Sequence, residues 1–476
     1  MNSSRIEMPL AARKIRPDPI ARAFKGALAS LLTLVLALAP VAADAQQRPK
    51  TIIRDAEIES LLLDYAKPIF GAAGIGSSGA EIVIIQDNAF NAFVASGRRM
   101  FINTGTLLEA KTPNEVIGVI AHETGHLAGG HLQNLRNEMA RAQAIGAIAS
   151  ILSVGAAVAG ASAGSSELAR GGAAAMTLGP SMAMRSLLSY RRAQEIAADR
   201  AALTYLNATR QSAKGMIDIF RKFADQSLFS AQYVDPYVQS HPMPRERIAQ
   251  LESVAAKSAY WNAKDPPALQ FRHDMMRAKL SGYTESPGRI ARRFPSSDKS
   301  LPATYARAIL AYRTGGLRSA LGQIDALIRT EPNNPYFHEL KGQALLESGK
   351  AAESIGPLRQ AQSLAPKAGL IRILLGHALL ETGKKGLLDE AIGNLRTGLR
   401  SEPLSSNGYR FLATAYAEQG RIPEAELATA QGLLIEGQVD AAKGYARRVQ
   451  AKVKHGTPEW LQADDILTYK PINTDS

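Results

Sequence analysis

Hydrophobic and polar residues follow each other along this chain mostly with helical spacing. Residues 51–70 fit one helix, and the β-branched run at 81–86 predicts a short strand after it. Residues 91–103 predict two more short strands, joined by a turn at 96–97. We therefore expect an α+β fold that is mostly helical and contains one small sheet.

The clearest helix signal begins at Thr112. This residue can cap a helix, Pro113 suits the first helical position, and Glu115 completes a capping box. The uncharged run at 116–121 continues the pattern. Residues that recur at helical spacing predict the buried stripe of this helix: Ile117, Ile120, Thr124 and Leu127.

Two long uncharged stretches follow, at 142–166 and 171–184. The first is long enough to span a bilayer, but it is poor in large aliphatic residues and rich in Gly, Ser and Ala. We predict an apolar helical hairpin at about 142–184 that packs against its domain or rests on a membrane surface. As a mobile lid it could also cover a cleft. A transmembrane pair is the alternative.

The C-terminal part of the sequence is helical and repetitive. Gly315, Gly349, Gly383 and Gly420 stand 34, 34 and 37 residues apart, and a small residue follows each of them. An insertion of three residues near 385–387 explains the longer interval. This period is typical of tetratricopeptide repeats, which stack into an all-α solenoid whose concave face binds peptides or partner proteins. A purely structural solenoid is the alternative.

The N-terminus predicts a secretory signal peptide at residues 1–45. It has a basic region, an apolar core and an A-x-A cleavage site at 43–45, so the mature chain would begin at Gln46. An uncleaved membrane anchor is the alternative. We predict the remaining segments as a domain at 46–262, linking helices at 263–300, tetratricopeptide repeats at 301–445, and a capping helix with a loose tail at 446–476.

Composition limits the partners. The formal net charge of +13 favours a negatively charged neighbour, such as an anionic membrane surface. Nucleic acid is a poor candidate, because no basic run is interleaved with aromatic residues. The chain has no cysteine, which excludes disulfides and a lipid-modified N-terminal cysteine. Packing alone must therefore hold its domains together.

The helix that begins at Thr112 carries a complete HExxH motif, from His122 to His126. The two histidines are four residues apart, so they lie one turn above each other on one helix face and can supply two ligands for Zn²⁺. Glu123 lies beside them, where it can act as the general base that takes a proton from the attacking water.

Two residues compete for the role of third ligand. His131 almost matches a longer zinc motif, but on a continuous helix it would point away from His122. Only a break at Gly129-Gly130 could bring it back, so we interpret His131 as structural. The better candidate is Glu195, which would complete a site with an open fourth position. Asp199, four residues on, would accept a hydrogen bond from a ligand histidine and fix its orientation.

These motifs carry a family resemblance. HExxH at 122–126 followed by ExxAD at 195–199 resembles the gluzincin family that contains HtpX and the CAAX prenyl proteases. The segments at 91–105 and 240–248 also resemble that family. The second segment, together with the C-terminal repeats, resembles a periplasmic subgroup, the β-barrel assembly-enhancing proteases. The resemblance spans roughly residue 50 to the end of the repeats.

The resemblance implies a zincin-type metalloprotease domain at 46–262 that holds one Zn²⁺. In zincins, the strand just upstream of the active-site helix is an exposed sheet edge, to which a substrate chain can add by main-chain hydrogen bonds. A hairpin without a substrate role is the alternative. In the subgroup, the residue that matches His241 can take the fourth position on zinc and keep the enzyme latent. His241 is therefore expected to gate the site.

The function implied is that of a periplasmic zinc endopeptidase. It would hydrolyse peptide bonds in misfolded or stalled outer-membrane β-barrel proteins and play a chaperone-like role in barrel assembly. The repeats would dock it to the barrel-assembly machinery. The alternative is a peptide-binding chaperone or adaptor, in which the tetratricopeptide surface dominates and the peptidase is latent.

Overall fold

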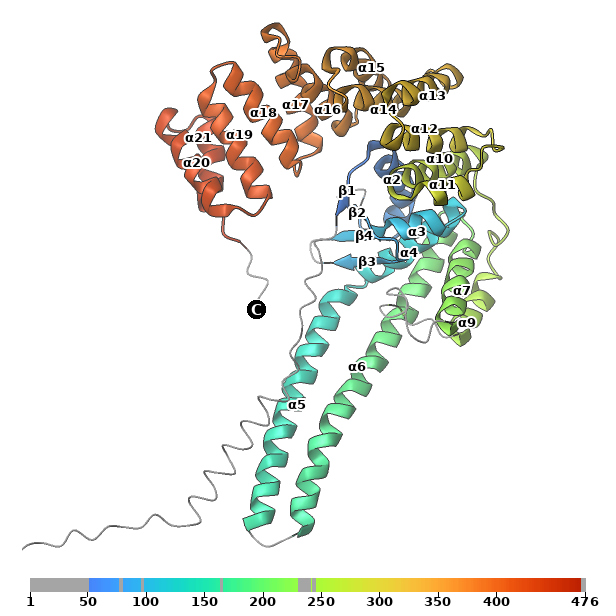
Figure 1. Ribbon diagram of the computed structural model, residues 1–476. Helices are drawn as coiled ribbons and strands as arrows, with labels where there is room; N and C mark the ends of the chain where they lie inside the picture. The colour runs from blue at the N-terminus through green and yellow to red at the C-terminus, as the bar shows by residue number, and fades with distance from the viewer. Residues whose placement is uncertain are drawn as a thin grey trace, which may run out of the picture. The chain divides into compact units, whose positions relative to one another are not determined.

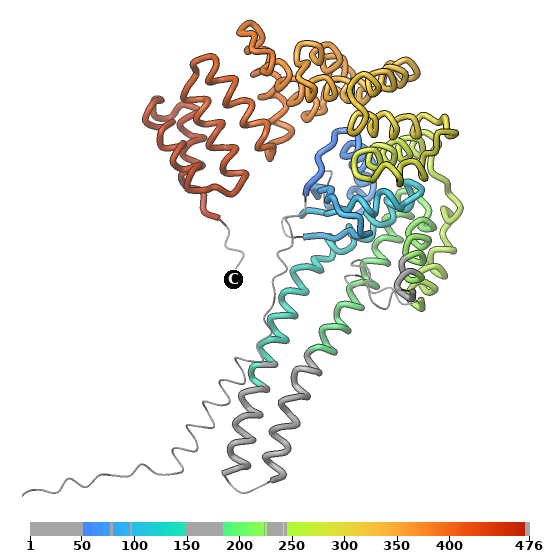
Figure 2. Tube along the Cα trace, viewed as in Figure 1, coloured from blue at the N-terminus to red at the C-terminus, as the bar shows by residue number. Residues whose placement is uncertain are grey.

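A computed structural model describes residues 51–76, 80–95, 98–162, 166–229, 241 and 245–471 (Figure 1 and Figure 2). Side chains are described throughout these ranges except at 146, 149–183, 223 and 226–229. Three predictions lie outside the described residues: the signal peptide at 1–45, its cleavage before Gln46, and the turn at 96–97.

The sheet has four strands: β1 (Ile52–Ile53), β2 (Glu81–Ile85), β3 (Ala92–Ala95) and β4 (Arg99–Asn103). Their order is β1-β2-β4-β3, with β2 and β4 parallel and both outer pairs antiparallel. This order corrects the predicted sheet edge. The strand just upstream of the helix that carries HExxH is β4, and it is paired on both sides, because β4 closes a hairpin with β3 and also pairs with β2. The free edge on this side of the sheet belongs to β3.

Helices pack around α4 (Pro113–Ala128), which carries HExxH. Helices α2 (Ala56–Ala72), α6 (Ser166–Ala208) and α7 (Lys214–Phe229) contact it directly. Helix α3 (Thr104–Glu109) precedes it in the chain, and α9 (Arg245–Ala255) packs on α6 and α7. The predicted stripe of α4 is buried from Ile117 to Thr124 and half-buried at Leu127. Val116, Val119 and Ala121 are also buried, so α4 is enclosed on more sides than an amphipathic surface helix would be.

The predicted apolar hairpin is formed by α5 (His131–Ser162) and α6, which lie side by side (Figure 1). Both helices extend well beyond the predicted bounds of 142–184. Most of the described side chains on the two arms are exposed, including Ile145, Ile148 and Met184, so these do not pack against the domain. Among the described residues, no helix is long and apolar enough to cross a membrane. The lid and membrane-surface roles remain predictions.

Linking helices α10 (Pro267–Thr284) and α11 (Pro287–Arg293) precede five pairs of helices. These pairs are α12 (Leu301–Thr314) with α13 (Leu317–Thr330), α14 (Pro335–Glu347) with α15 (Ala351–Leu364), α16 (Gly369–Leu380) with α17 (Leu388–Ser401), α18 (Ser406–Glu418) with α19 (Ile422–Ile435), and α20 (Val439–Lys452) with α21 (Pro458–Thr468). The boundary that we predict at 445/446 falls inside α20, so the capping pair begins earlier than expected.

Three of the four repeat glycines lie in the left-handed region of backbone conformation. Gly349, Gly383 and Gly420 have positive φ angles of 75°, 64° and 76°, which a residue with a side chain rarely adopts. In the first repeat the neighbour Gly316 takes this role, with φ of 89°. The three-residue insertion at 385–387 forms the short 3-10 helix η1 (Lys385–Leu387).

A buried ionic cluster joins the first helices of the repeats to the rest of the chain. Lys279 on α10 lies 2.7 Å from Asp55, 3.3 Å from Glu57 and 3.7 Å from Glu339. The Tyr305 hydroxyl donates a hydrogen bond of 3.0 Å to Glu57. Asp55 caps α2, and the other residues lie on α2, α10, α12 and α14, so charge pairing links segments that are far apart in the sequence.

Candidate metal centre

The two zinc motifs meet because α4 and α6 approach each other closely at Gly125. A Cβ atom built on Gly125 would lie 2.8 Å from the carbonyl oxygen of Ala198 and 2.9 Å from its Cα atom. No side chain fits at that distance. Gly125 stands between the two histidines of HExxH, and Ala198 lies inside ExxAD. This contact therefore places the two motifs against each other.

The start of α4 fixes the position of the motif along the helix. Thr112 accepts a hydrogen bond from the backbone N–H of Glu115, as the capping box predicts. The side chain of Glu115 accepts from the N–H of Lys111, one residue before the cap. The second hydrogen bond of the capping box therefore goes to the residue before the cap and not to Thr112 itself. With the start of the helix fixed in this way, His122 lies in its third turn and is fully buried.

Four side chains bring their donor atoms to one point: His122, His126, Glu195 and His241. The two Nε2 atoms of His122 and His126 are 3.1 Å apart, and each lies 3.4 Å from a carboxylate oxygen of Glu195. The Nδ1 atom of His241 lies 3.1 Å from both oxygens of Glu195 and 3.4 Å from Nε2 of His122.

The donor set fits Zn²⁺. Ligands of a tetrahedral zinc ion at its usual bond lengths are about 3.3 Å from each other, and the separations above lie close to this value. Imidazole nitrogen and carboxylate oxygen are ordinary zinc ligands, and the chain offers no competing thiolate. The four residues could therefore hold one metal ion, and no large movement of the described backbone is needed.

Asp199 and Arg247 contact two of the candidate ligands, His122 and Glu195, from outside the donor cluster. Asp199 Oδ1 lies 3.0 Å from Nδ1 of His122, the ring nitrogen that does not face the cluster. Arg247 donates two hydrogen bonds to Asp199, of 2.6 and 2.8 Å, and its Nη2 lies 3.2 Å from Glu195. Burial would raise the pKa of Asp199, but Arg247 and His122 outweigh it and hold the pKa below its ordinary value. The carboxyl group of Asp199 therefore stays ionised.

Glu123 has a different environment. It is fully buried, and neither carboxylate oxygen accepts a hydrogen bond from any described residue. The nearest cationic candidate is Nε2 of His241, at 3.5 Å. Burial raises the pKa of Glu123, and the neighbouring His241 and His122 only partly oppose it. A buried carboxylate with a raised pKa and unused acceptor capacity is suited to taking up and releasing a proton.

His131 lies outside the group of clustered donor atoms, although the chain brings it close to one of them. The break that we considered is present: α4 ends at Ala128, Gly130 has a φ of 61°, and α5 begins at His131. The break does bring His131 back, with its Nδ1 3.0 Å from Nδ1 of His126. His131 contacts the side of the His126 ring that faces away from the donor cluster, which is the position of a residue that orients a candidate ligand.

A cleft of about 420 Å³ opens onto the cluster. Edge strand β3 forms one side of it through Phe93, Val94 and Ala95. Glu123 and the first turn of α5 also line it. An extended chain lying along β3 would therefore pass close to the donor cluster.

The structure brings together all six predicted site residues and adds one that sequence reasoning missed. Predicted were His122, Glu123, His126, Glu195, Asp199 and His241. Arg247 received no role, although it lies in the segment 240–248 that we singled out. Its charge and its place six residues after His241 were the available signals, but only the packing of α9 on α6 shows that it pairs with Asp199 and Glu195.

Comparison with known proteins agrees with this geometry. The sequence model of peptidase family M48 matches residues 53–255, and that of a tetratricopeptide repeat matches 305–369 and 373–448. Beta-barrel assembly-enhancing protease of Escherichia coli K12 is 23% identical over 80% of this chain and 76% of its own length. A putative protein of that name from Vibrio cholerae is 24% identical over 84% and 81%. Among solved structures, one of MamA matches 35% of this chain with 19% identity and a TM-score of 0.30, which carries no argument.

The matched M48 region contains HExxH, ExxAD and the clustered donor atoms of His122, His126 and Glu195. The matched repeat regions coincide with the paired helices from α12 to α20. Residues 53–255 are therefore a metallopeptidase domain of family M48, and tetratricopeptide repeats follow it.

Proposed function

We propose that this chain is a periplasmic zinc endopeptidase that cleaves misfolded or stalled outer-membrane proteins and aids the assembly of others. The observation that carries the catalytic part is the donor cluster of His122, His126 and Glu195 beside the buried carboxylate of Glu123, whose oxygens accept no hydrogen bond from a described residue. The biological part is supported by the relatives called beta-barrel assembly-enhancing protease, which align over three quarters or more of their own length.

In this proposal His122, His126 and Glu195 hold one Zn²⁺ per chain. Bound zinc supplies Lewis-acid activation of a water molecule and of the scissile carbonyl group. Glu123 takes the proton from the attacking water and delivers it to the leaving amine, a role to which its raised pKa is matched. Asp199 keeps the His122 ring in the orientation that presents Nε2 to the cluster.

His241 gates the site. Its Nδ1 occupies the corner of the cluster that a catalytic metal site leaves open, and its Nε2 faces Glu123 at 3.5 Å. In this position the ring excludes water from the fourth corner and stands next to the general base. Cleavage therefore requires His241 to move away.

The substrate is an extended polypeptide segment. The edge strand β3 lies on the cleft, and main-chain pairing to a free edge does not depend on sequence. Such recognition suits unfolded or stalled proteins, because their backbone hydrogen-bonding groups are accessible. A folded β-barrel, whose strands are already paired, would not be held in this way.

Metal analysis and cleavage of an unfolded casein-type probe test the catalytic proposal. The wild-type chain should contain one zinc, and Glu123→Gln should keep the zinc while losing cleavage by a factor of about 100 or more. His126→Ala and Glu195→Ala should both lose most of the zinc. A wild-type chain without stoichiometric metal, or full activity in Glu123→Gln, would refute the proposal.

A separate variant tests the gate. His241→Ala should raise cleavage of the probe and of the chain itself, since it frees the fourth corner. His338→Ala is a matched control, because His338 is only half-buried, lies in the repeats and bonds only to the backbone of Pro332 in the described contacts. Unchanged or lower activity in His241→Ala would indicate a role in transition-state stabilisation or in packing.

The second candidate function is that of a chaperone or adaptor with a latent peptidase. It is favoured by His241, which closes the cluster in this structure, and by the matched repeats, which are interaction modules. In this reading the repeats dock the chain to the barrel-assembly machinery. Complementation of a deletion strain separates the two: full rescue by Glu123→Gln supports the adaptor, and loss of rescue supports the peptidase.

Export is part of the same proposal and has its own test. Residues 1–45 should be removed during secretion, which leaves Gln46 at the N-terminus of the periplasmic protein. Edman sequencing of the protein from a periplasmic fraction gives a direct readout. A retained N-terminus in the membrane fraction would favour the uncleaved anchor, and release by high salt would indicate peripheral contact with an anionic surface.

A further inference from the structure

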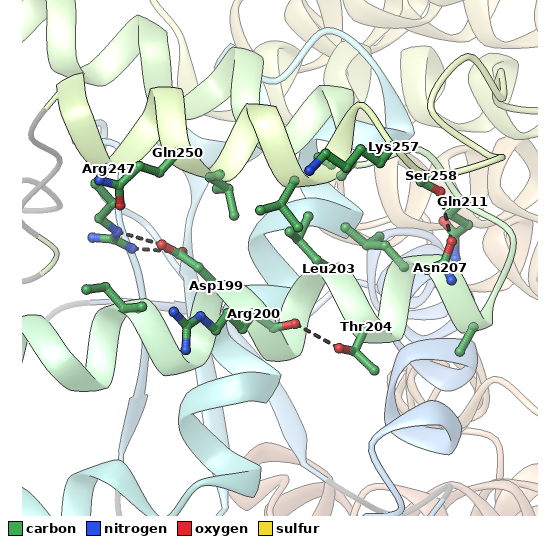
Figure 3. A pocket seen from close by; sticks show the side chains of 17 residues that line it. Asp199, Arg200, Leu203, Thr204, Asn207, Gln211, Arg247, Gln250, Lys257 and Ser258 are labelled. Carbon is green, nitrogen blue, oxygen red and sulfur yellow. Dashed lines mark hydrogen bonds and ion pairs between the residues drawn. The ribbon is translucent and has the colours of Figure 1, made fainter.

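A second cavity, of about 790 Å³, lies between α6 and α9 (Figure 3). Its floor is made of the buried apolar side chains of Leu206, Leu251 and Ala255 and of the half-buried Leu203. At its rim, large apolar side chains remain exposed on both helices. These are Ile196 on α6, at 41%, and Val254 on α9, at 59%. The groove therefore has an apolar floor and a rim that is apolar in part, and its volume is that of a typical ligand site.

The charges around this groove are unbalanced. Arg200 on α6 and Lys257, two residues after the end of α9, line it from opposite sides. Both are exposed, and neither makes an ion pair with a residue in the described ranges. The only acidic residue in its lining is Asp199, whose oxygens already accept two hydrogen bonds from Arg247 (Figure 3). Two positive charges without a described counter-charge thus stand beside an apolar floor.

The dimensions of the groove limit its occupant further. The lining of α6 runs from Ile196 to Ala208, a length of about 18 Å at the helical rise. This suits one extended hydrocarbon chain of medium length. A small inorganic anion would leave the apolar floor exposed to water, and an uncharged lipid would leave Arg200 and Lys257 without partners.

We propose that this groove binds a single-chain anionic amphiphile. Its hydrocarbon chain lies on the floor formed by Leu203, Leu206 and Leu251, and its carboxylate or phosphate headgroup contacts Arg200 and Lys257. The proposal does not depend on the peptidase activity.

The groove also shares residues with the metal centre. The Arg247–Asp199 pair forms part of its lining, and the same two side chains contact Glu195 and His122. An occupant of the groove therefore lies next to the residues that hold two of the candidate zinc ligands.

Titration calorimetry on the full chain tests the proposal. The probes are dodecanoate, dodecyl phosphate and dodecyl maltoside, each below its micelle concentration. One or both anionic probes should bind once per chain, at least about threefold more tightly than the neutral maltoside. Tighter binding of the phosphate would indicate a lysophospholipid-type headgroup, and tighter binding of dodecanoate a fatty acid; either result supports the proposal.

Charge variants locate the headgroup. Arg200→Gln combined with Lys257→Gln should weaken binding of the anionic probes by roughly two- to twentyfold and leave the maltoside unchanged. The matched control is Arg318→Gln with Arg396→Gln, which removes the same charge from two exposed repeat residues that also lack a described ion pair. Circular dichroism verifies that both variants fold.

Apolar variants locate the chain. Ile196→Ser and Val254→Ser change exposed side chains, so folding should be unaffected while binding of all three probes weakens. Three results would overturn the proposal: no binding of any probe, equal binding of charged and neutral probes, or anion binding in the Arg200 and Lys257 variant that equals the control.

Discussion

Replacing Gly125 with alanine should lower the affinity for zinc strongly, while its effect on the free energy of unfolding should match that of a control substitution elsewhere on the same helix. The added methyl group would lie 2.8 Å from the carbonyl oxygen of Ala198, and ordinary van der Waals contact begins at 3.4 Å. Helices α4 and α6 must therefore separate by about 0.6 Å at this point. His122 and His126 lie on α4 and Glu195 lies on α6, so the same movement spreads the donor cluster.

The expected magnitudes follow from that displacement. Overpacking of this kind costs about 1 to 3 kcal/mol in the free energy of unfolding. A metal site tolerates displacements of only about 0.5 Å in its ligands. A movement of this size should lower zinc affinity by about 10- to 100-fold, the range seen when residues that orient ligands are removed.

Gly118→Ala is the matched control. A methyl group at Gly118 would lie 2.7 Å from Cα of Met216, so it pushes α4 away from α7 and leaves the contact with α6 in place. Both variants should lose similar stability in chelator, measured by denaturant unfolding. Only Gly125→Ala should lose zinc strongly in competition with a chromophoric chelator. If Gly125→Ala held zinc as tightly as Gly118→Ala, close packing at Gly125 would not be what assembles the site.

Three further predictions follow from buried contacts. Arg247→Met leaves Asp199 and Glu195 without their cation and should lower the free energy of unfolding in chelator by about 3 to 5 kcal/mol; a loss below about 1 kcal/mol would contradict this. His131→Ala should reduce zinc affinity about 10- to 100-fold in the same competition assay without changing the stoichiometry, and unaltered affinity would show that it does not orient its neighbour. Burial raises the pKa of Glu339 from its ordinary value of 4.5 to about 7. Between pH 4.5 and pH 7 the folded state therefore holds a proton that the unfolded state has already lost, and this stabilisation disappears as the pH rises through 7. Unfolding titrations should therefore show stability that falls over this window, and a smaller fall in Glu339→Gln; an equal fall in the variant would place the titration elsewhere.

The sequence predicted those parts of the site that depend on residues close together on one helix. The cap at Thr112, the four-residue spacing of His122 and His126, and the spacing of Glu195 and Asp199 all act within one or two helical turns. The repeat pattern is equally local, since positive-φ glycines end the first helix of successive pairs. Such features can be read from sequence because the residues involved are neighbours on one element.

Other features depend on topology and were not predictable in this way. The edge strand is β3 and not β4, because β4 pairs in parallel with β2, and no residue in the hairpin itself records that pairing. His131 could be placed only once the helix was known to break at Gly130, where a φ of 61° turns the chain. Both differences come from the path of the backbone between elements.

The contacts of Arg247 depend both on its own helix and on how that helix packs against a distant one. It is 48 residues from Asp199 in the sequence, yet the two are joined by paired hydrogen bonds in a buried setting. Its helix, α9, begins four residues after His241, which we propose as the gate, so the proposed gate and the cation that pairs with the carboxylates are close neighbours in the chain. A movement of α9 would act on both at once. Opening of the fourth corner is therefore expected to be coupled to the support of His122, since Asp199 contacts Arg247 on one side and His122 on the other.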